Sequence, residues 1–79
     1  MTPEQASKTI KSVLGEIAPD ADLDALSPDA DLRDTLGLDS LDFLNFVEML
    51  SERSGKRIDE DDYPQLATLA SGVAFLSGR

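Results

Sequence analysis

Histidine and cysteine are both absent from this chain of 79 residues. Their absence removes the commonest general base, the thiol nucleophile and the usual transition-metal ligands. The lack of cysteine also excludes a disulfide framework, which fits a reducing cytosol. Aspartate and glutamate are plentiful, but they form no paired constellation that predicts a catalytic site. We therefore expect a protein that is not an enzyme.

Long apolar runs and basic residues are scarce as well. No apolar run reaches membrane-spanning length, and the N-terminus has no signal-peptide pattern. The chain carries 7 basic and 16 acidic residues, which gives a net charge of −9. This balance disfavours nucleic-acid binding, because phosphate backbones select basic surfaces, and it suits basic patches on protein partners. We expect a cytoplasmic monomer that neither inserts into membranes nor binds nucleic acid.

The length predicts one small domain, residues 1–79. A chain of this size buries only about 60% of its unfolded surface, so its core is thin. There is room for a few helices around one apolar seam, and hardly any for an enclosed catalytic cleft.

The first segment has the pattern of a helix. Thr2 and Gln5 match a capping box, and Pro3 suits the first helical position. Pro19 disfavours helix at the preceding residue and should end the element. Five apolar residues recur at helical spacing and predict a buried stripe: Ala6, Ile10, Val13, Leu14 and Ile17.

Residues 18–38 form a long connection that is rich in aspartate and interrupted by proline and glycine. A connection of this length needs a function or anchors in a compact domain. Short helical turns are expected after Ser27–Pro28. Four leucines are expected to anchor the connection onto the helices: Leu23, Leu26, Leu32 and Leu36.

The same connection contains a partial match to a calcium-binding loop. Asp20, Asp22 and Asp24 imitate the opening of an EF-hand loop. The glycine required at the sixth position is replaced by Ala25, and no bidentate glutamate closes the loop. Calcium binding is therefore disfavoured.

A second helix is predicted to begin at Asp39, whose carboxylate can cap the first turn. Ser40 then occupies the first helical position, where free N–H groups and the helix dipole favour an attached phosphate. One stripe of this helix has core spacing and consists of Phe43, Phe46, Val47 and Leu50. Leu41, Leu44 and Glu48 fall on a different face, beside the serine.

Two shorter helices should complete the chain. Gly55 is expected to end the second helix. The acidic run Asp59–Asp62 should begin a short third helix, which Tyr63–Pro64 closes. A fourth helix should begin after the capping residue Thr68. Gly72 weakens this last helix by roughly 1 kcal/mol relative to alanine.

The order of these elements, with the stretch Gly37–Asp42 before the second helix, resembles the acyl carrier protein family over nearly the whole chain. The resemblance implies an all-α fold, a small four-helix bundle with a long loop between helices 1 and 2 and a short third helix. It also implies that Ser40 carries 4′-phosphopantetheine, which a phosphopantetheinyl transferase moves from coenzyme A. The thiol of that group would hold acyl intermediates as thioesters for partner enzymes of fatty-acid, lipid or polyketide-like biosynthesis.

The resemblance further implies two sets of contact residues. Acidic positions on or beside the second helix would guide basic surfaces of the transferase and of acyl-handling enzymes: Asp39, Asp42, Glu48 and Glu52. Leu41 and Leu44 would make apolar contact with the same partners. Two apolar residues would help to line a cavity between the helices that shelters an acyl chain: Ile58 and Leu66.

Several positions depart from the common pattern of the family. Asn45 stands where an acidic residue is frequent, and Glu48 where an apolar residue is common. Tyr63 is bulky where small residues are frequent, so it should narrow the cavity between the helices. These departures favour a specialised carrier that serves a dedicated pathway. The segments Asp39–Val47 and Asp62–Leu69 resemble a subgroup of free-standing bacterial carriers.

Two alternatives remain open. Carriers of aminoacyl or peptidyl groups often have glycine just before the serine, and Asp39 in that place favours acyl cargo. A helical interaction module without a prosthetic group would use Ser40 only as a helix-start residue, which is an ordinary role for serine.

Overall fold

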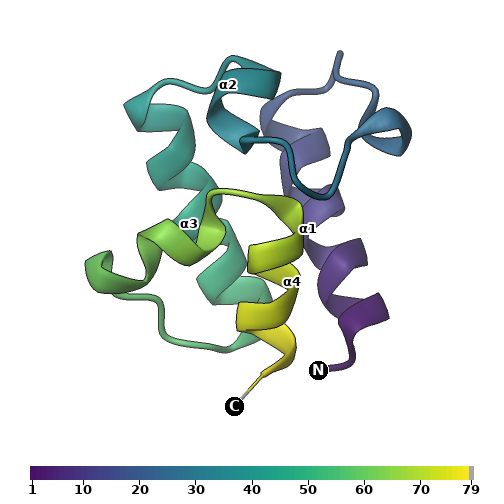
Figure 1. The fold of residues 1–79 in the computed structure, drawn as a ribbon. Coiled ribbons are helices and arrows are strands. Elements are labelled where there is room, and N and C mark those ends of the chain that lie inside the picture. The colour runs from purple at the N-terminus through teal and green to yellow at the C-terminus, as the bar shows by residue number, and fades with distance from the viewer. Residues whose placement is uncertain (79) are drawn as a thin grey trace.

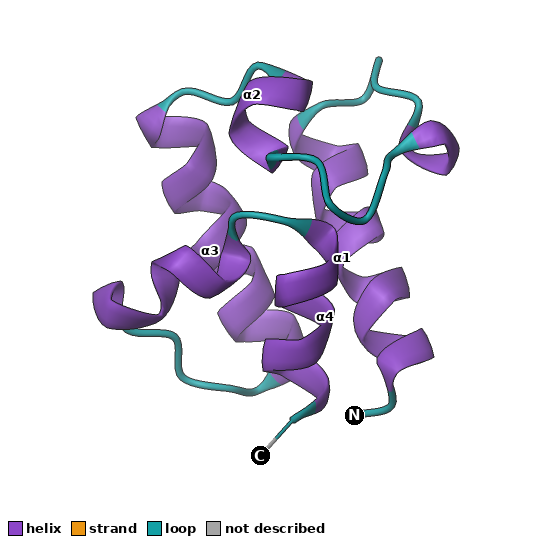
Figure 2. Cartoon of the chain, in the orientation of Figure 1, coloured by secondary structure: helices purple, strands orange, loops and turns teal. Residues whose placement is uncertain are grey.

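The computed structural model describes residues 1–78, which form four α-helices and two 3-10 helices (Figure 1). In chain order these are α1 (Pro3–Ile17), η1 (Leu23–Ala25), α2 (Leu32–Leu36), α3 (Ser40–Ser54), η2 (Glu60–Leu66) and α4 (Leu69–Ser77). This part of the chain contains no strand (Figure 2), and one isolated bridge joins Asp31 to Thr68. The all-α prediction is confirmed: α1, α3, η2 and α4 are the predicted helices, and η1 and α2 lie in the long loop.

The helix α1 packs against both α3 and α4 (Figure 1). Its N-terminus has the predicted capping box: the Gln5 N–H donates to Thr2 Oγ1 at 3.1 Å, and the Thr2 N–H donates to Gln5 Oε1 at 3.0 Å. The predicted stripe is buried except at Ile17, which is half-buried against the same core. The apolar spacing in the sequence of α1 therefore reflects the packing of this helix against the core.

The helix α3 supplies the opposite side of the core. Its predicted stripe is buried and consists of Phe43, Phe46, Val47 and Leu50. The helix ends at Gly55, which has a φ of 68° in the left-handed region that glycine adopts without steric cost. The predicted start, stripe and end of this helix are all confirmed.

The long connection of residues 18–38 is held down by side chains and by backbone hydrogen bonds. Leu26 and Leu32 are buried, and Leu23 and Leu36 are half-buried against the core, so the predicted anchors are confirmed. The Leu32 N–H donates to the Ala67 carbonyl at 2.8 Å, and the Ala70 N–H donates to the Pro28 carbonyl at 2.9 Å. These two bonds tie the connection to the start of α4.

The predicted end of the third helix is wrong. Tyr63–Pro64 does not close η2, which continues to Leu66 with Pro64 inside it. A 3-10 helix tolerates this residue because proline forfeits a single i→i+3 bond and still offers its carbonyl. That carbonyl accepts the Ala67 N–H at 3.3 Å.

The last helix approaches α1 closely at Gly72, which is buried. A Cβ atom at this position would lie 3.1 Å from Ile10 Cδ1 and 3.7 Å from Leu66 Cδ2. The missing side chain therefore lets α4 pack directly on α1, which accounts for a glycine that lowers helix propensity.

No helix within residues 1–78 is both long enough and apolar enough to cross a bilayer.

Candidate functional site at the start of α3

Ser40 is the first residue of α3, and its side chain is exposed. The carboxylate of Asp39 accepts the N–H of Asp42 at 2.8 Å, and the Asp39 carbonyl accepts the N–H of Phe43 at 3.0 Å. The first of these bonds satisfies one of the four N–H groups that a helix start leaves free, and the second is the first regular bond of the helix. The N–H groups of Ser40 and Leu41 have no partner within residues 1–78, so they remain available at the serine.

The two acidic residues around the serine also have a structural role. In addition to the Asp39 cap, the Asp39 N–H donates to Asp42 Oδ2 at 3.4 Å, which completes a capping box. Both carboxylates therefore help to fix the first turn of α3. They hold Ser40 at a defined place, whether or not they also meet a partner protein.

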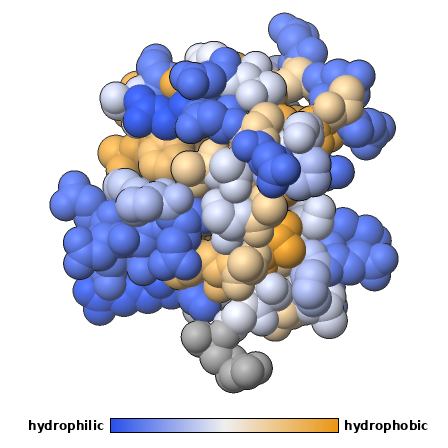
Figure 3. Space-filling view, viewed as in Figure 1, coloured by the Kyte–Doolittle hydropathy of each residue, from blue (hydrophilic) through white to orange (hydrophobic). Residues whose placement is uncertain are grey.

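A pocket of about 480 Å³ opens beside Ser40, between the start of α3 and η2. Figure 3 shows apolar surface at the left of the view, between two hydrophilic areas. The Phe43 and Tyr63 rings meet edge to face, with centroids 5.7 Å apart. The lining is largely apolar and consists of Asp31, Arg33, Ser40, Phe43, Leu44, Tyr63, Pro64 and Ala67. An exposed hydroxyl therefore lies at the rim of an apolar hollow.

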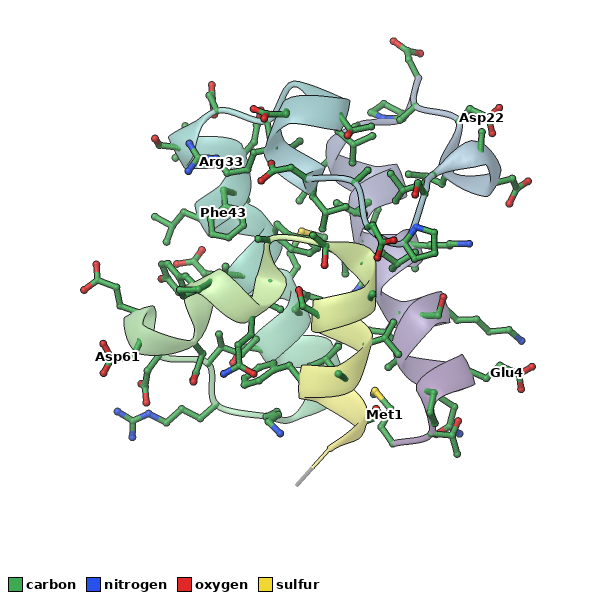
Figure 4. All side chains as sticks on the ribbon, viewed as in Figure 1. Met1, Glu4, Asp22, Arg33, Phe43 and Asp61 are labelled. Carbon is green, nitrogen blue, oxygen red and sulfur yellow. The ribbon has the colours of Figure 1, made fainter. Side chains whose placement is uncertain are left out.

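Arg33 is the residue at this site that the sequence reasoning missed. Its Nη2 lies 3.4 Å from Ser40 Oγ, and its Cζ lies 5.4 Å from the centroid of the Phe43 ring. Figure 4 shows Arg33 and Phe43 as neighbours. A signal for it does exist in the sequence, because Arg33 is the only basic residue between Lys11 and Arg53.

Of the six residues predicted to contact partners, Asp42 is half-buried and the other five are exposed. Leu41 and Leu44 are 66% and 42% exposed, values unusual for large apolar side chains in this chain. Glu48 and Glu52 are exposed on the same helix. The predicted separation of an inner and an outer face of α3 is therefore confirmed, whereas the binding of partners to the outer face stays a prediction.

The two residues predicted to line an acyl cavity lie elsewhere. Leu66 is fully buried in the core, and Ile58 is half-buried against it. Neither lines the pocket beside Ser40. Their role in sheltering an acyl chain stays a prediction.

The acidic loop shows no metal centre. Within residues 1–78, no group of three or more aspartate and glutamate side chains is arranged to hold a metal ion. Asp20 and Asp22 instead border a separate surface hollow next to α2.

Comparison with known proteins identifies the class of domain. A family model described as "Phosphopantetheine attachment site" matches residues 7–76. The chain is 29% identical over 76 residues to an acyl carrier protein of Nitratidesulfovibrio vulgaris (strain DSM 19637 / Miyazaki F), which covers 96% of this chain and 93% of the relative. It is 27% identical over 67 residues to an acyl carrier protein of Desulforapulum autotrophicum, which covers 85% of this chain and 87% of the relative.

The fold agrees with this class. A solved structure of the acyl carrier protein from Enterococcus faecalis superposes with a TM-score of 0.78 at 24% identity, over 98% of this chain and 96% of that one. The chain is thus a domain of the kind that carries phosphopantetheine as a covalently bound prosthetic group. It belongs to the acyl carrier protein family, whose members are carriers and not enzymes.

The start of α3 fits such a group. The exposed Ser40 hydroxyl offers an oxygen for a phosphodiester, and the unpartnered N–H groups of Ser40 and Leu41 lie at the positive end of the helix dipole. The apolar pocket next to the hydroxyl gives a flexible arm a surface on which to rest.

Proposed function

We propose that this chain is a cytoplasmic acyl carrier protein and that Ser40 is its attachment residue. The observation that carries the assignment is the exposed Ser40 hydroxyl at the capped start of α3, beside the apolar pocket. The relatives named acyl carrier protein support acyl cargo over aminoacyl or peptidyl cargo. The cargo would be delivered to enzymes of fatty-acid, lipid or polyketide-like biosynthesis, and residues 1–79 would act as one carrier domain.

In this proposal the chain presents its serine and performs no chemistry on the cargo. The Asp39–Asp42 capping box holds the first turn of α3, so Ser40 Oγ meets the transferase in a fixed position. The helix N-terminus stabilises the negative charge that attachment brings. When bound, 4′-phosphopantetheine supplies a terminal thiol on which acyl groups are held as thioesters.

The outer face of α3 is the proposed docking surface for the phosphopantetheinyl transferase and for acyl-handling enzymes. Leu41 and Leu44 would fill apolar depressions at the centre of the contact, because both are exposed beside Ser40. Glu48 and Glu52 would pair with basic residues at its edge. Such edge charges mainly raise the encounter rate, whereas buried apolar anchors contribute most of the affinity.

For the acyl chain itself, we propose a path inward past Tyr63 toward Ile58 and Leu66. Leu66 follows Tyr63 by three residues on η2, and both pack against the core. An acyl chain that enters there has to separate the Phe43 and Tyr63 rings, whose centroids are 5.7 Å apart. Short or compact cargo is therefore favoured.

The test of the assignment is intact-protein mass after incubation with coenzyme A, magnesium and a broad-specificity phosphopantetheinyl transferase. We expect the natural chain to gain one phosphopantetheine and the Ser40→Ala variant to gain none. Ser27→Ala is the matched control, since Ser27 is another exposed serine and lies in the loop. Circular dichroism checks that each variant is folded. A folded natural chain that gains no mass would support the helical interaction module instead.

A further inference from the structure

The charge around Ser40 is unusual for this chain. Residues 12–52 contain one basic residue, Arg33, among many aspartates and glutamates, in a chain of net charge −9. That one cation lies with its Nη2 3.4 Å from Ser40 Oγ. A chain that needed only an acidic surface would gain nothing from a guanidinium at this point.

The guanidinium of Arg33 is not used in an ion pair. Within residues 1–78 the ion pairs join Arg53 to Glu16 and Arg57 to Asp59, and no carboxylate lies within 4.0 Å of Arg33. The guanidinium lies over Phe43 in a cation–π contact, with Cζ 5.4 Å from the ring centroid (Figure 4). This contact takes up no carboxylate, and Nη2 faces Ser40 Oγ.

The backbone holds Arg33 in this place. The α2 helix is capped by Asp31, which accepts the N–H of Asp34 at 3.0 Å, and it ends at Gly37 with a φ of 68°. The carbonyl of Arg33 accepts the N–H of Leu38 at 2.9 Å, two residues before Ser40. The turn that leads into the attachment serine thus also fixes the arginine beside it.

We propose that Arg33 pairs with the phosphodiester that joins the prosthetic group to Ser40, and that it directs the arm toward the pocket beside Phe43. The inference rests on the proposed function, since it requires the group to be on Ser40. On attachment Ser40 Oγ loses its proton and becomes an ester oxygen, and the anionic oxygens lie on the phosphorus bonded to it, next to the guanidinium that contacts Oγ. Arginine binds such oxygens through two parallel, charge-assisted hydrogen bonds. With Arg33 on the Phe43 side, the arm leaves Ser40 across Phe43 and Leu44, which line the pocket.

The experiment compares loaded and unloaded protein for the natural chain, Arg33→Gln, Arg33→Lys and Arg57→Gln. Arg57 is the matched control, because it is an exposed arginine paired with Asp59 instead of the serine. Mass spectrometry confirms complete loading of each sample. We expect loading to raise the melting temperature of the natural chain and of Arg57→Gln by roughly 2–5 °C at low salt. The gain should fall by at least half in Arg33→Gln and be intermediate in Arg33→Lys.

A purely structural role of Arg33 gives a different result. Loss of the cation–π contact with Phe43 would lower the melting temperatures of loaded and unloaded Arg33→Gln equally, so the gain on loading would be unchanged. Equal gains, together with an unchanged phosphorus-31 shift of the phosphodiester in Arg33→Gln, would overturn the proposal. The natural chain gives a second measurement that needs no variant: the Arg33 Nε–H resonance should move on loading, and that of Arg57 should not.

The two hypotheses fail in distinguishable ways. A natural chain that accepts no phosphopantetheine overturns the proposed function, and this inference falls with it. A natural chain that is loaded on Ser40 while its Arg33 Nε–H resonance stays in place overturns the inference alone.

Discussion

The helices α1 and α3 are alike in construction and differ in what they expose. Each has 15 residues, begins with a capping box and buries four side chains. The outward residues of α1 are polar, as at Lys8, Ser12 and Glu16, whereas α3 exposes Leu41 and Leu44 beside Ser40. Since both inner faces pack into the same core, the two helices differ in the apolar surface that α3 exposes beside Ser40, and this surface supports the proposed docking site.

The two helices are also joined differently at their ends. At the end of α3 far from Ser40, Arg53 forms an ion pair with Glu16 and its Nη1 donates to Ser12 Oγ at 3.0 Å, so α1 holds this end directly. The Ser40 end is positioned by α2 and the long connection. One end of α3 is therefore fixed by another helix, and Ser40 at the other end is exposed to solvent.

The largest expected loss of unfolding free energy comes from truncating a buried side chain, and it should be similar on the inner faces of α1 and α3. Phe46 of α3 and Ile10 of α1 are fully buried. Phe46→Ala should lower the free energy of unfolding by about 3–5 kcal/mol and Ile10→Ala by about 2–5 kcal/mol, because each leaves a cavity. Either loss is a large part of the stability of a small domain. Urea unfolding followed by circular dichroism measures it, and a cost below about 1 kcal/mol for either variant would contradict this core.

The similarity of α1 and α3 could be predicted from the sequence because it is local. Caps and apolar stripes depend on residues three or four positions apart. Thr2, Asp39 and the two stripes were therefore sufficient to predict where both helices begin and which face each one buries. The exposure of Leu41 and Leu44 followed from the same spacing. The position of Ser40 at the start of α3 could be predicted from the capping residue Asp39 alone.

The features that the sequence did not reveal depend on more than the spacing of residues along a helix. Arg33 reaches Ser40 across the turn at Gly37, where the Arg33 carbonyl accepts the Leu38 N–H, and two further backbone bonds tie residues 28 and 32 to residues 70 and 67. From the sequence, Gly72 only lowers the helix propensity of α4. In the structure a Cβ atom at this position would lie 3.1 Å from Ile10 Cδ1, so the glycine allows close packing. Pro64 lies inside η2 because the segment forms a 3-10 helix, which a proline pattern alone does not distinguish from a helix end.

Substitutions at the caps of the two helices should distinguish an effect on stability from an effect on loading. Thr2→Ala and Asp39→Ala each remove a side chain that accepts a backbone N–H, at 3.1 Å and 2.8 Å, so each should cost about 1 kcal/mol of unfolding free energy. Only Asp39→Ala should also slow loading by the transferase, because only that cap fixes the turn that carries Ser40. Unfolding curves and loading rates measure the two effects.

Asp39→Asn is the matched control for charge at this cap. Asparagine still accepts the Asp42 N–H, so its stability should stay close to that of the natural chain. If the loading rate of Asp39→Asn falls as far as that of Asp39→Ala, the carboxylate acts on the transferase directly. Equal loading rates for Thr2→Ala and Asp39→Ala would contradict the prediction that only the cap of α3 affects loading.

The smallest effect on stability is expected on the outer faces, where the two helices differ most in function. Leu41→Ala and Lys8→Ala remove exposed side chains, so each should change the unfolding free energy by less than about 0.5 kcal/mol. Leu41→Ala should nevertheless lower kcat/KM for transfer of phosphopantetheine by roughly five- to tenfold, as expected for loss of an apolar anchor. Lys8→Ala should leave it unchanged. If transfer to Leu41→Ala were as fast as transfer to the natural chain, the exposed leucine would be an ordinary surface residue, and the docking surface would have to rest on Leu44 and the acidic side chains alone.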